Sequence, residues 1–436
     1  MAFFGILMLW QVYLIYVPLY LRDLLISQFG GTAQDWAYIV GVIMALDNLF
    51  ALLLIPIFSW LSDKKTRTRY GRRIPYIFAG TIAAAIFFPF IAVMAIIDSL
   101  VWTIVMMTMV IIAMGIYRSP AIALMPDITP KPLRSKANAI INFVGYIGAI
   151  VGTGLTMLFV MDNKNLTIIP FVVTAVIMIG ILIMLMLRFK ENAVVEEMKS
   201  DLALGEELAE TLEKVEEGKP MGRRDKINMF VMMSAVFCAF FAFNALNTFG
   251  STFAEEVLEV TTREWGLGLQ ALAITSLLTF LPSIKLTRRI GRKYSIMLGL
   301  LFIIIPMVIA GFYNQFSIFL VMLFAISGAG WAIINVNTLP AIMEMANKSN
   351  VAVIVGVYYV ASQVAHALTS IVVGVVFTAW GFEMYFFYAA FWMSVAFVFC
   401  IFFKPRKVGQ EKFTCEEITD TAGEVVIEDE GLAVVE

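Results

Sequence analysis

The chain alternates between long apolar stretches and short turns that hold its charged, Gly and Pro residues. Each stretch has 18 residues or more, close to the ~20 helical residues that cross a bilayer core. Only 15% of residues are charged and the mean hydropathy is +0.87, whereas soluble domains have about 25% charged residues. The sequence therefore predicts an all-α polytopic membrane protein with twelve spans, near 3–21, 36–61, 76–97, 101–125, 137–160, 166–188, 227–249, 265–282, 294–312, 316–343, 351–378 and 384–403.

The basic residues fix the predicted orientation. With the N-terminus inside, 27 of the 31 Lys and Arg residues fall in cytoplasmic segments, three fall outside, and Arg118 lies within a span. Positive charge is retained on the cytoplasmic side, so we expect a cell-membrane protein with both termini in the cytoplasm. The first apolar run has no basic residue before it and reads as a first span rather than a signal peptide. The lipid bilayer is its expected surrounding, and the net charge of −2 gives no reason to expect a nucleic-acid partner.

The two halves of the chain resemble each other. YGRRIPYIFAG, from Tyr70, aligns with IGRKYSIMLGL, from Ile290, and IYRSPAIALMPDI aligns with IINVNTLPAIMEM at nearly the same offset. Parallel repeats with Pro-interrupted helices at matching places are typical of transporters whose site lies between the halves. The predicted parts are a six-helix bundle (1–189), a cytoplasmic central loop (190–226), a second six-helix bundle (227–403) and an acidic cytoplasmic tail (404–436).

Asp47 and Arg118 are the only Asp, Glu, Lys or Arg side chains deep inside predicted spans. Charges inside a membrane are costly and most often serve function, and paired charges cost less than single ones. We interpret Asp47 as the carboxylate that binds a proton or another cation, and Arg118 as the residue that tunes it and contacts the substrate. The alternative is a static structural ion pair.

Further polar residues lie inside apolar helices and are candidate substrate contacts. Each could equally bond one helix to another, and Trp331 could stack on a sugar ring or simply fill the core. The set contains no second acid and no Lys, which suits a neutral hydroxylated solute better than an anion. The candidates are Asn48, Asn142, Tyr146, Asn244, Asn247, Trp331, Asn335, Asn337, Tyr358, Gln363 and His366.

Charged residues at the predicted cytoplasmic ends of the spans are candidates for a gate that breaks when the halves rock. The alternative is that they only set topology. A single histidine leaves no basis for a His-based triad or a His-ligated metal centre, so we expect neither an enzyme nor a metal or cofactor. The gate candidates are Asp63, Arg72, Arg73, Asp127, Arg292 and Glu344.

The segment SWLSDKKTRTRYGRRIPYIFAG resembles the loop after helix 2 of the major facilitator superfamily. Its long, Thr- and Arg-rich form is similar to that of the glycoside-pentoside-hexuronide:cation symporters and the sucrose-transporter-like group. RSPAIALMPDITPKPLRSKANA resembles the helix 4 to 5 segment of the same group. The resemblance covers nearly the whole chain and implies the fold of that superfamily, a monomeric transporter and a sugar substrate.

Departures from the group bear on the coupling ion. Melibiose-permease-like members carry acids on helix 2 where this chain has apolar residues, around Ala51 and Ile55, and an acid on helix 4 where it has Arg118. Ser59 replaces the Gly that usually opens the loop. The resemblance therefore favours proton coupling through Asp47 over a sodium site, with a di- or oligosaccharide of the sucrose, maltose or α-glucoside type as substrate. Two alternatives stay open: a transporter of a lysolipid, a pigment precursor or a drug, and a non-transporting membrane sensor.

Overall fold

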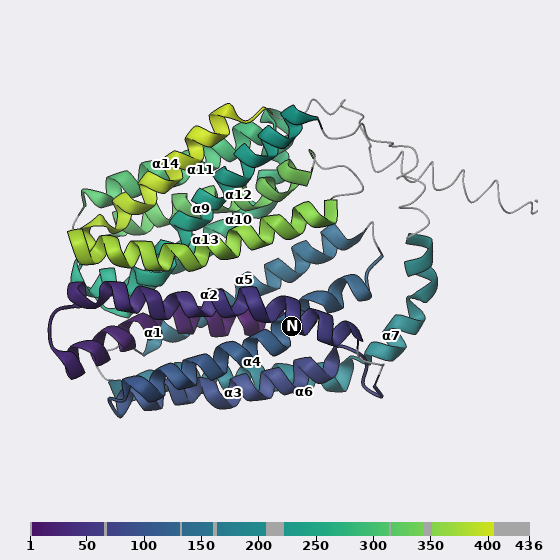
Figure 1. Cartoon of the computed structure of the whole chain (residues 1–436), viewed down its shortest axis with the longest axis horizontal. Helices are drawn as coiled ribbons and strands as arrows, with labels where there is room; N and C mark the ends of the chain where they lie inside the picture. The colour runs from purple at the N-terminus through teal and green to yellow at the C-terminus, as the bar shows by residue number, and fades with distance from the viewer. Residues whose placement is uncertain are drawn as a thin grey trace, which may run out of the picture.

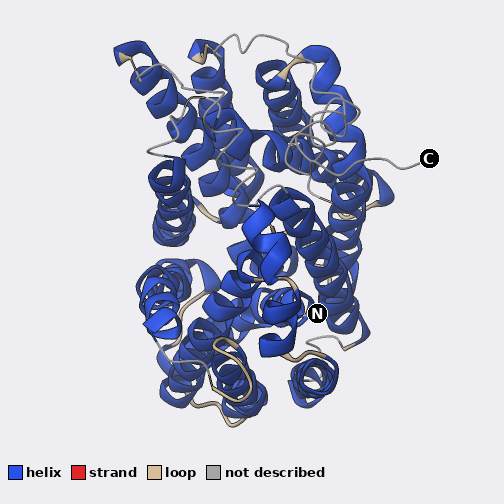
Figure 2. Ribbon diagram, turned by 90° about the vertical axis from the view of Figure 1, so that its right-hand side faces the viewer, coloured by secondary structure: helices blue, strands red, loops and turns tan. Residues whose placement is uncertain are grey.

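A computed structural model describes residues 2–64, 68–130, 133–159, 164–205, 222–313, 315–343, 345 and 351–404. Every regular element of these ranges apart from one isolated bridge is a helix, and 12 helices are long and apolar enough to cross a membrane. The prediction of an all-α polytopic protein is confirmed, and the helices run side by side in one direction across the molecule (Figures 1 and 2).

The first group of spanning helices forms the lower part of Figure 1. Its members are α1 (Ala2–Phe29), α2 (Ala33–Lys64), α3 (Ile74–Ile96), α4 (Leu100–Asp127), α5 (Arg134–Leu158) and α6 (Ile168–Arg188), the last preceded by η2 (Lys164–Thr167). A short helix, α7 (Glu191–Glu197), follows at one end of the molecule. Residues 206–221 of the predicted central loop and residues 405–436 of the predicted tail lie outside the described residues.

The second group forms the upper part of Figure 1. Its members are α9 (Arg223–Glu256), α10 (Thr262–Ile290), α11 (Arg292–Gly311), α12 (Ile318–Met343), α13 (Val351–Trp380) and α14 (Tyr385–Phe402), the last preceded by η3 (Phe382–Met384). Within each group, small residues let helices approach closely, as lipid-embedded packing requires. Gly80 against Tyr117 on α4 and Gly299 against Gly330 on α12 show this in the two groups.

The two groups meet along α2 with α13, α5 with α10 and α1 with α9. The closest approach joins α2 and α13, where a Cβ on Gly41 would collide with the carbonyl oxygen of Ser370, and a Cβ on Gly374 would lie 2.7 Å from the carbonyl oxygen of Ala37. Farther along the same seam, Thr378 accepts from the amide of Tyr38 at 3.1 Å. These contacts lie at the end of the molecule opposite α7, called the far end below.

Burial along α2 changes between its two ends. Val40 and Met44, in the half near the far end, are 2% and 1% exposed, whereas Leu53 and Trp60, in the half near α7, are 62% and 56% exposed. On the partner helix α13, the fully buried residues likewise lie toward the far end, and the half near α7 is more exposed. The closest approaches between the two groups therefore lie at the far end, and α2 is less covered by protein toward α7.

Candidate functional site

Asp47 lies midway along α2 and is 2% exposed. Its Oδ1 accepts hydrogen bonds from the backbone amide and the side-chain Nδ2 of Asn48, which is itself buried. Arg118 on α4 is partly buried and interacts electrostatically with Asp47. Among the ion pairs of the described residues, however, none joins these two side chains. The carboxylate is therefore held by Asn48 and not by an ion pair with Arg118.

The α5 side of the interface between the two groups carries Tyr146 and Asn142. Tyr146 packs against Phe280 of α10 at 5.9 Å between ring centroids and lies near Trp331 on α12. Asn142 lies one turn earlier on α5 and is partly buried. Tyr146 therefore links the two groups across their interface, midway along the helices.

Trp331 is packed among aromatic rings. Its indole stacks on Phe243 with 3.6 Å between ring centroids and an angle of 4° between the planes, and it meets Phe240 edge-on at 5.4 Å. The residue is 6% exposed. One face of the indole is thus covered by the protein, which leaves at most the other face for a ligand.

Two of the candidate amides bond to the backbone of their own helix. Asn247 donates to the carbonyl oxygen of Phe243 on α9, and Asn335 donates to that of Trp331 on α12, each at 3.0 Å. Bonds to the residue four positions earlier occupy the Nδ2 groups and leave the Oδ1 atoms without a described partner. The side-chain Nδ2 groups of Asn247 and Asn335 are therefore occupied by bonds to their own helices.

Two further amides connect helices. Asn244 on α9 donates to the carbonyl oxygen of His366 at 3.0 Å and to Ser370 at 3.3 Å, both on α13. Asn337 on α12 is 1% exposed and accepts from Thr287 of α10 at 2.8 Å. These bonds join one helix to another, which is the alternative role expected for amides inside the membrane.

The remaining candidates lie on α13. Tyr358 shares a hydrogen bond of 3.3 Å with Thr338 of α12, and Gln363 is partly buried. His366 packs its ring against Phe240 at 5.4 Å, and its Nε2 is buried without a hydrogen-bond partner among the described residues. His366 also interacts electrostatically with Arg118, so the two lie in one neighbourhood although they come from different groups.

The structure places part of the gate set within the first group. Asp127, at the end of α4, accepts from Arg72 at 3.0 Å and from Arg73 at 2.9 Å, and Arg73 also donates to Ser62. Arg292 begins α11 in the second group and is partly buried. The side chain of Asp63, like Glu344, lies outside the described residues. The described ion pairs therefore tie the end of α4 to the turn before α3.

Glu191 completes this network and was not among the sequence candidates. Its carboxylate is 4% exposed and accepts from the backbone amides of Arg72, Arg73 and Ile74, at distances of 2.7 to 3.1 Å. Gly71 adopts φ +115°, and a Cβ there would collide with Glu191. A carboxylate at a helix N-terminus is favourable, so Glu191 docks the start of α7 onto the turn before α3. The sequence did not indicate this docking role, because Glu191 belongs to a segment with many glutamates.

An ion-pair cluster at the far end was also missed. Arg22 on α1 pairs with Glu255 at 2.7 Å and Glu256 at 3.0 Å, both at the end of α9, and with its neighbour Asp23 at 2.7 Å. The Arg22 side chain is 9% exposed. The sequence signal was a lone Arg at the end of the first span and a Glu pair at the end of the seventh.

We expect Arg22→Gln to weaken closure of the far end. Removing one partner of a buried ion pair costs about 3 to 5 kcal/mol, and three carboxylates would remain without their cation. The melting temperature should fall, and the second substitution Glu255→Gln should recover part of the loss because it removes an unpaired charge. Thermal denaturation of both variants, with Lys164→Gln as the control cation, checks this. An unchanged melting temperature for Arg22→Gln would contradict it.

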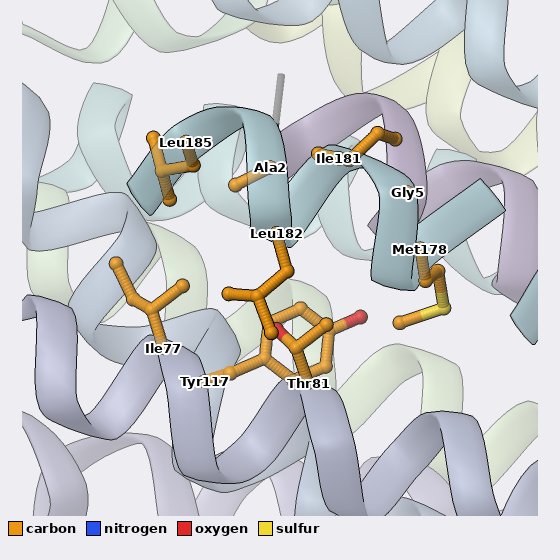
Figure 3. A pocket seen from close by; sticks show the side chains of 9 residues that line it. All are labelled: Ala2, Gly5, Ile77, Thr81, Tyr117, Met178, Ile181, Leu182 and Leu185. Atoms are coloured by element: carbon orange, nitrogen blue, oxygen red, sulfur yellow. The ribbon is translucent and has the colours of Figure 1, made fainter. Parts of the chain in front are cut away.

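A small pocket lies inside the first group, between α1, α3, α4 and α6. Leu182, Thr81 and Tyr117 point toward one another within it (Figure 3), and its free volume is about 20 Å³. That volume accommodates about one water molecule, whereas small-molecule sites measure about 300 Å³ or more. This pocket is therefore not the substrate site. In the described residues, no three His, Cys, Asp or Glu side chains gather as a metal site.

Two groups of six spanning helices, closely packed at one end and lined by buried polar residues at their interface, define a transporter-type membrane fold. The chain belongs to the Major Facilitator Superfamily, whose profile matches residues 1–370 and 232–417. No curated protein sequence matches this chain significantly.

Solved structures show the same fold. The inward-open xylose transporter XylE from E. coli is 13% identical, with a TM-score of 0.67 over 96% of this chain and 98% of that chain. The nucleoside transporter NupG is 16% identical, with a TM-score of 0.62 over 93% and 98%. A bacterial homolog of the human lysosomal transporter Spinster, inward-facing and occupied, is 13% identical, with a TM-score of 0.67 over 92% and 95%. At these identities the likeness concerns the fold alone.

Proposed function

We propose that the chain is a secondary active transporter that couples uptake of a di- or oligosaccharide to protons. The observation that carries this proposal is Asp47, a carboxylate 2% exposed in the middle of a membrane span and in the electrostatic field of Arg118. A deeply buried intramembrane carboxylate that lacks a direct cationic partner among the described ion pairs is suited to carrying a proton. Arg118 and His366, from the two groups, are the donors that would meet the substrate.

Transport would proceed by alternating access, as in other transporters built from two bundles. The tight seam at the far end and the exposed flanks of α2 and α13 near α7 support a state open toward α7. The distribution of basic residues favours a cytoplasmic location for α7, and in that orientation this state would face inward. Substrate and proton would bind between the groups in the cell membrane, within a single chain, and would be released together when the seam has closed.

A transporter of a less polar solute is the second candidate. Phe240, Phe243 and Trp331 form an aromatic cluster at the interface, and the indole face turned to Phe243 is unavailable to a sugar. Apolar walls with few polar groups are typical of sites for drug-like molecules. This candidate differs from the first in substrate and shares its fold and access mechanism.

The test is transport by the purified chain in proteoliposomes. Radiolabelled maltose, sucrose and melibiose would be offered under an inward proton gradient, an inward sodium gradient, or neither. We expect accumulation of at least one sugar with the proton gradient only. Accumulation driven by sodium would overturn proton coupling, and the absence of sugar transport under every gradient would favour the less polar solute.

A further inference from the structure

Tyr13 is a buried tyrosine whose hydroxyl has no partner within the described part of the chain. The residue lies on α1 and is 0% exposed, and its hydroxyl is among the buried polar atoms of the described residues that form no hydrogen bond. Leaving a buried hydroxyl unpaired costs free energy, and a bilayer core supplies no water to offset that cost. An unpaired group at such a place calls for a functional explanation.

The neighbouring tyrosines of α1 are bonded. Tyr16 donates to the carbonyl oxygen of Phe159, and Tyr20 hydrogen bonds with Thr167 at 2.5 Å. These three tyrosines are spaced three and four residues apart, so they share one face of the helix. Along this face, the hydroxyl farthest from the far end is the unpaired one.

Tyr13 and Asp47 lie at similar depths. Tyr13 precedes the end of α1 at Phe29 by 16 residues, and Asp47 follows the start of α2 at Ala33 by 14 residues. At about 1.5 Å per residue, both lie roughly 21 to 24 Å from the far end. The helices α1 and α2 are in contact, and Asp47 acts electrostatically on the Tyr13 hydroxyl.

The carboxylate of Asp47 retains an acceptor for this donor. Both of its described hydrogen bonds end on Oδ1, so Oδ2 accepts none within the described residues. The Tyr13 ring is stacked on Trp10, with 5.3 Å between centroids and 6° between planes, and this restricts its motion. Asp47 interacts electrostatically with Tyr13 and with Arg118 on α4, and Arg118 in turn interacts with Tyr117 on α4 and His366 on α13.

We propose that Tyr13 is a positioning residue of the proton site. In the state open at the far end, its hydroxyl donates a hydrogen bond to Oδ2 of Asp47 and stabilises the deprotonated carboxylate. The bond forms when opening of the seam releases α2 from α13 and α1 from α9. In the state of this structure the Tyr13 hydroxyl forms no hydrogen bond with Asp47. In this state a proton bound to Asp47 neutralises the carboxylate instead. This inference rests on the proposed role of Asp47 as the proton carrier.

The test is the pH profile of transport by Tyr13→Phe. Because a hydrogen bond to a charged group is lost, the pH at half-maximal transport should rise by about 1 to 2 units. The melting temperature of the inward-facing protein should not fall, because the hydroxyl removed has no described partner there. Tyr20→Phe is the matched control: it removes a bonded hydroxyl from the same helix face, so its stability should fall while its pH profile stays unchanged.

Three outcomes would overturn the inference. If the pH at half-maximal transport of Tyr13→Phe is unchanged or lower, the proposed hydrogen bond to Asp47 does not exist. If Tyr20→Phe shifts this pH equally, the shift is a general effect of losing a hydroxyl. A lower melting temperature of Tyr13→Phe would show that the hydroxyl is already bonded in the inward-facing state. If Asp47→Asn retains proton-driven accumulation, the proposed function itself fails, whatever Tyr13→Phe does.

Discussion

Asp47→Asn is expected to abolish proton-driven accumulation while leaving exchange of substrate across the membrane. Asparagine keeps the shape of the side chain and its contacts with Asn48, but it carries neither a charge nor an exchangeable carboxyl proton. The two access states then no longer differ in their affinity for a proton, so the gradient cannot drive the equilibrium between them. Substrate should equilibrate without being concentrated.

The measurement compares uptake under a proton gradient with counterflow of labelled for unlabelled substrate. The matched control is Asp35→Asn, an acid on the same helix whose carboxylate accepts from Thr32 at the exposed end of α2. This control should accumulate substrate like the unaltered chain. Continued accumulation by Asp47→Asn would place proton coupling elsewhere, and His366 would be examined next because its Nε2 has no partner within the described residues.

Gly41→Val should have the second large effect, because it obstructs the seam between α2 and α13. A side chain at Gly41 would collide with the backbone of Ser370, which cannot turn aside as a flexible side chain could. Overpacking of this kind costs about 1 to 3 kcal/mol or more, so we expect the far end to stay open and uptake to fall by about tenfold or more.

Access to the seam can be measured directly. A cysteine at Met44, 1% exposed and one turn farther along α2, would be labelled by a membrane-impermeant maleimide added outside, in a background without native cysteines. Labelling should be faster with Gly41→Val than without it. Gly356→Val on α13 is the control, because a Cβ there meets nothing within 4 Å. Slow labelling in both variants would mean that the seam tolerates the added side chain.

The spans were predictable because hydrophobic length is a local property of the sequence. Twelve stretches were predicted and 12 candidate spans are found. The helices extend beyond the predicted stretches, and α1 continues to Phe29 through Arg22 and Asp23. The predicted span ended before those charges, but Arg22 pairs with Asp23 and with the end of α9, which lets the helix continue past the apolar run.

Asp47 and Arg118 stood out in the sequence because charge is rare in spans. Whether the two side chains form an ion pair was not predictable, because the position along a helix gives only the depth of a residue. Tertiary packing decides which neighbouring helix its side chain faces. The candidate amides illustrate the same limit. Asn247 and Asn335 bond their own helices, whereas Asn244 and Asn337 also bond neighbouring ones. Nothing in the residue type separates these two pairs.

The sequence by itself determined the class of molecule: twelve spans, a buried carboxylate and a basic turn that is repeated in both halves. These features follow from the free energies of transferring individual residues into lipid, which do not depend on tertiary neighbours. Only the tertiary structure decided that Arg22 joins α1 to α9, that Glu191 caps α3, and that Tyr13 is left without a described partner beside Asp47. Each of these is a relation between groups on different helices, so its energy exists only once the helices have packed.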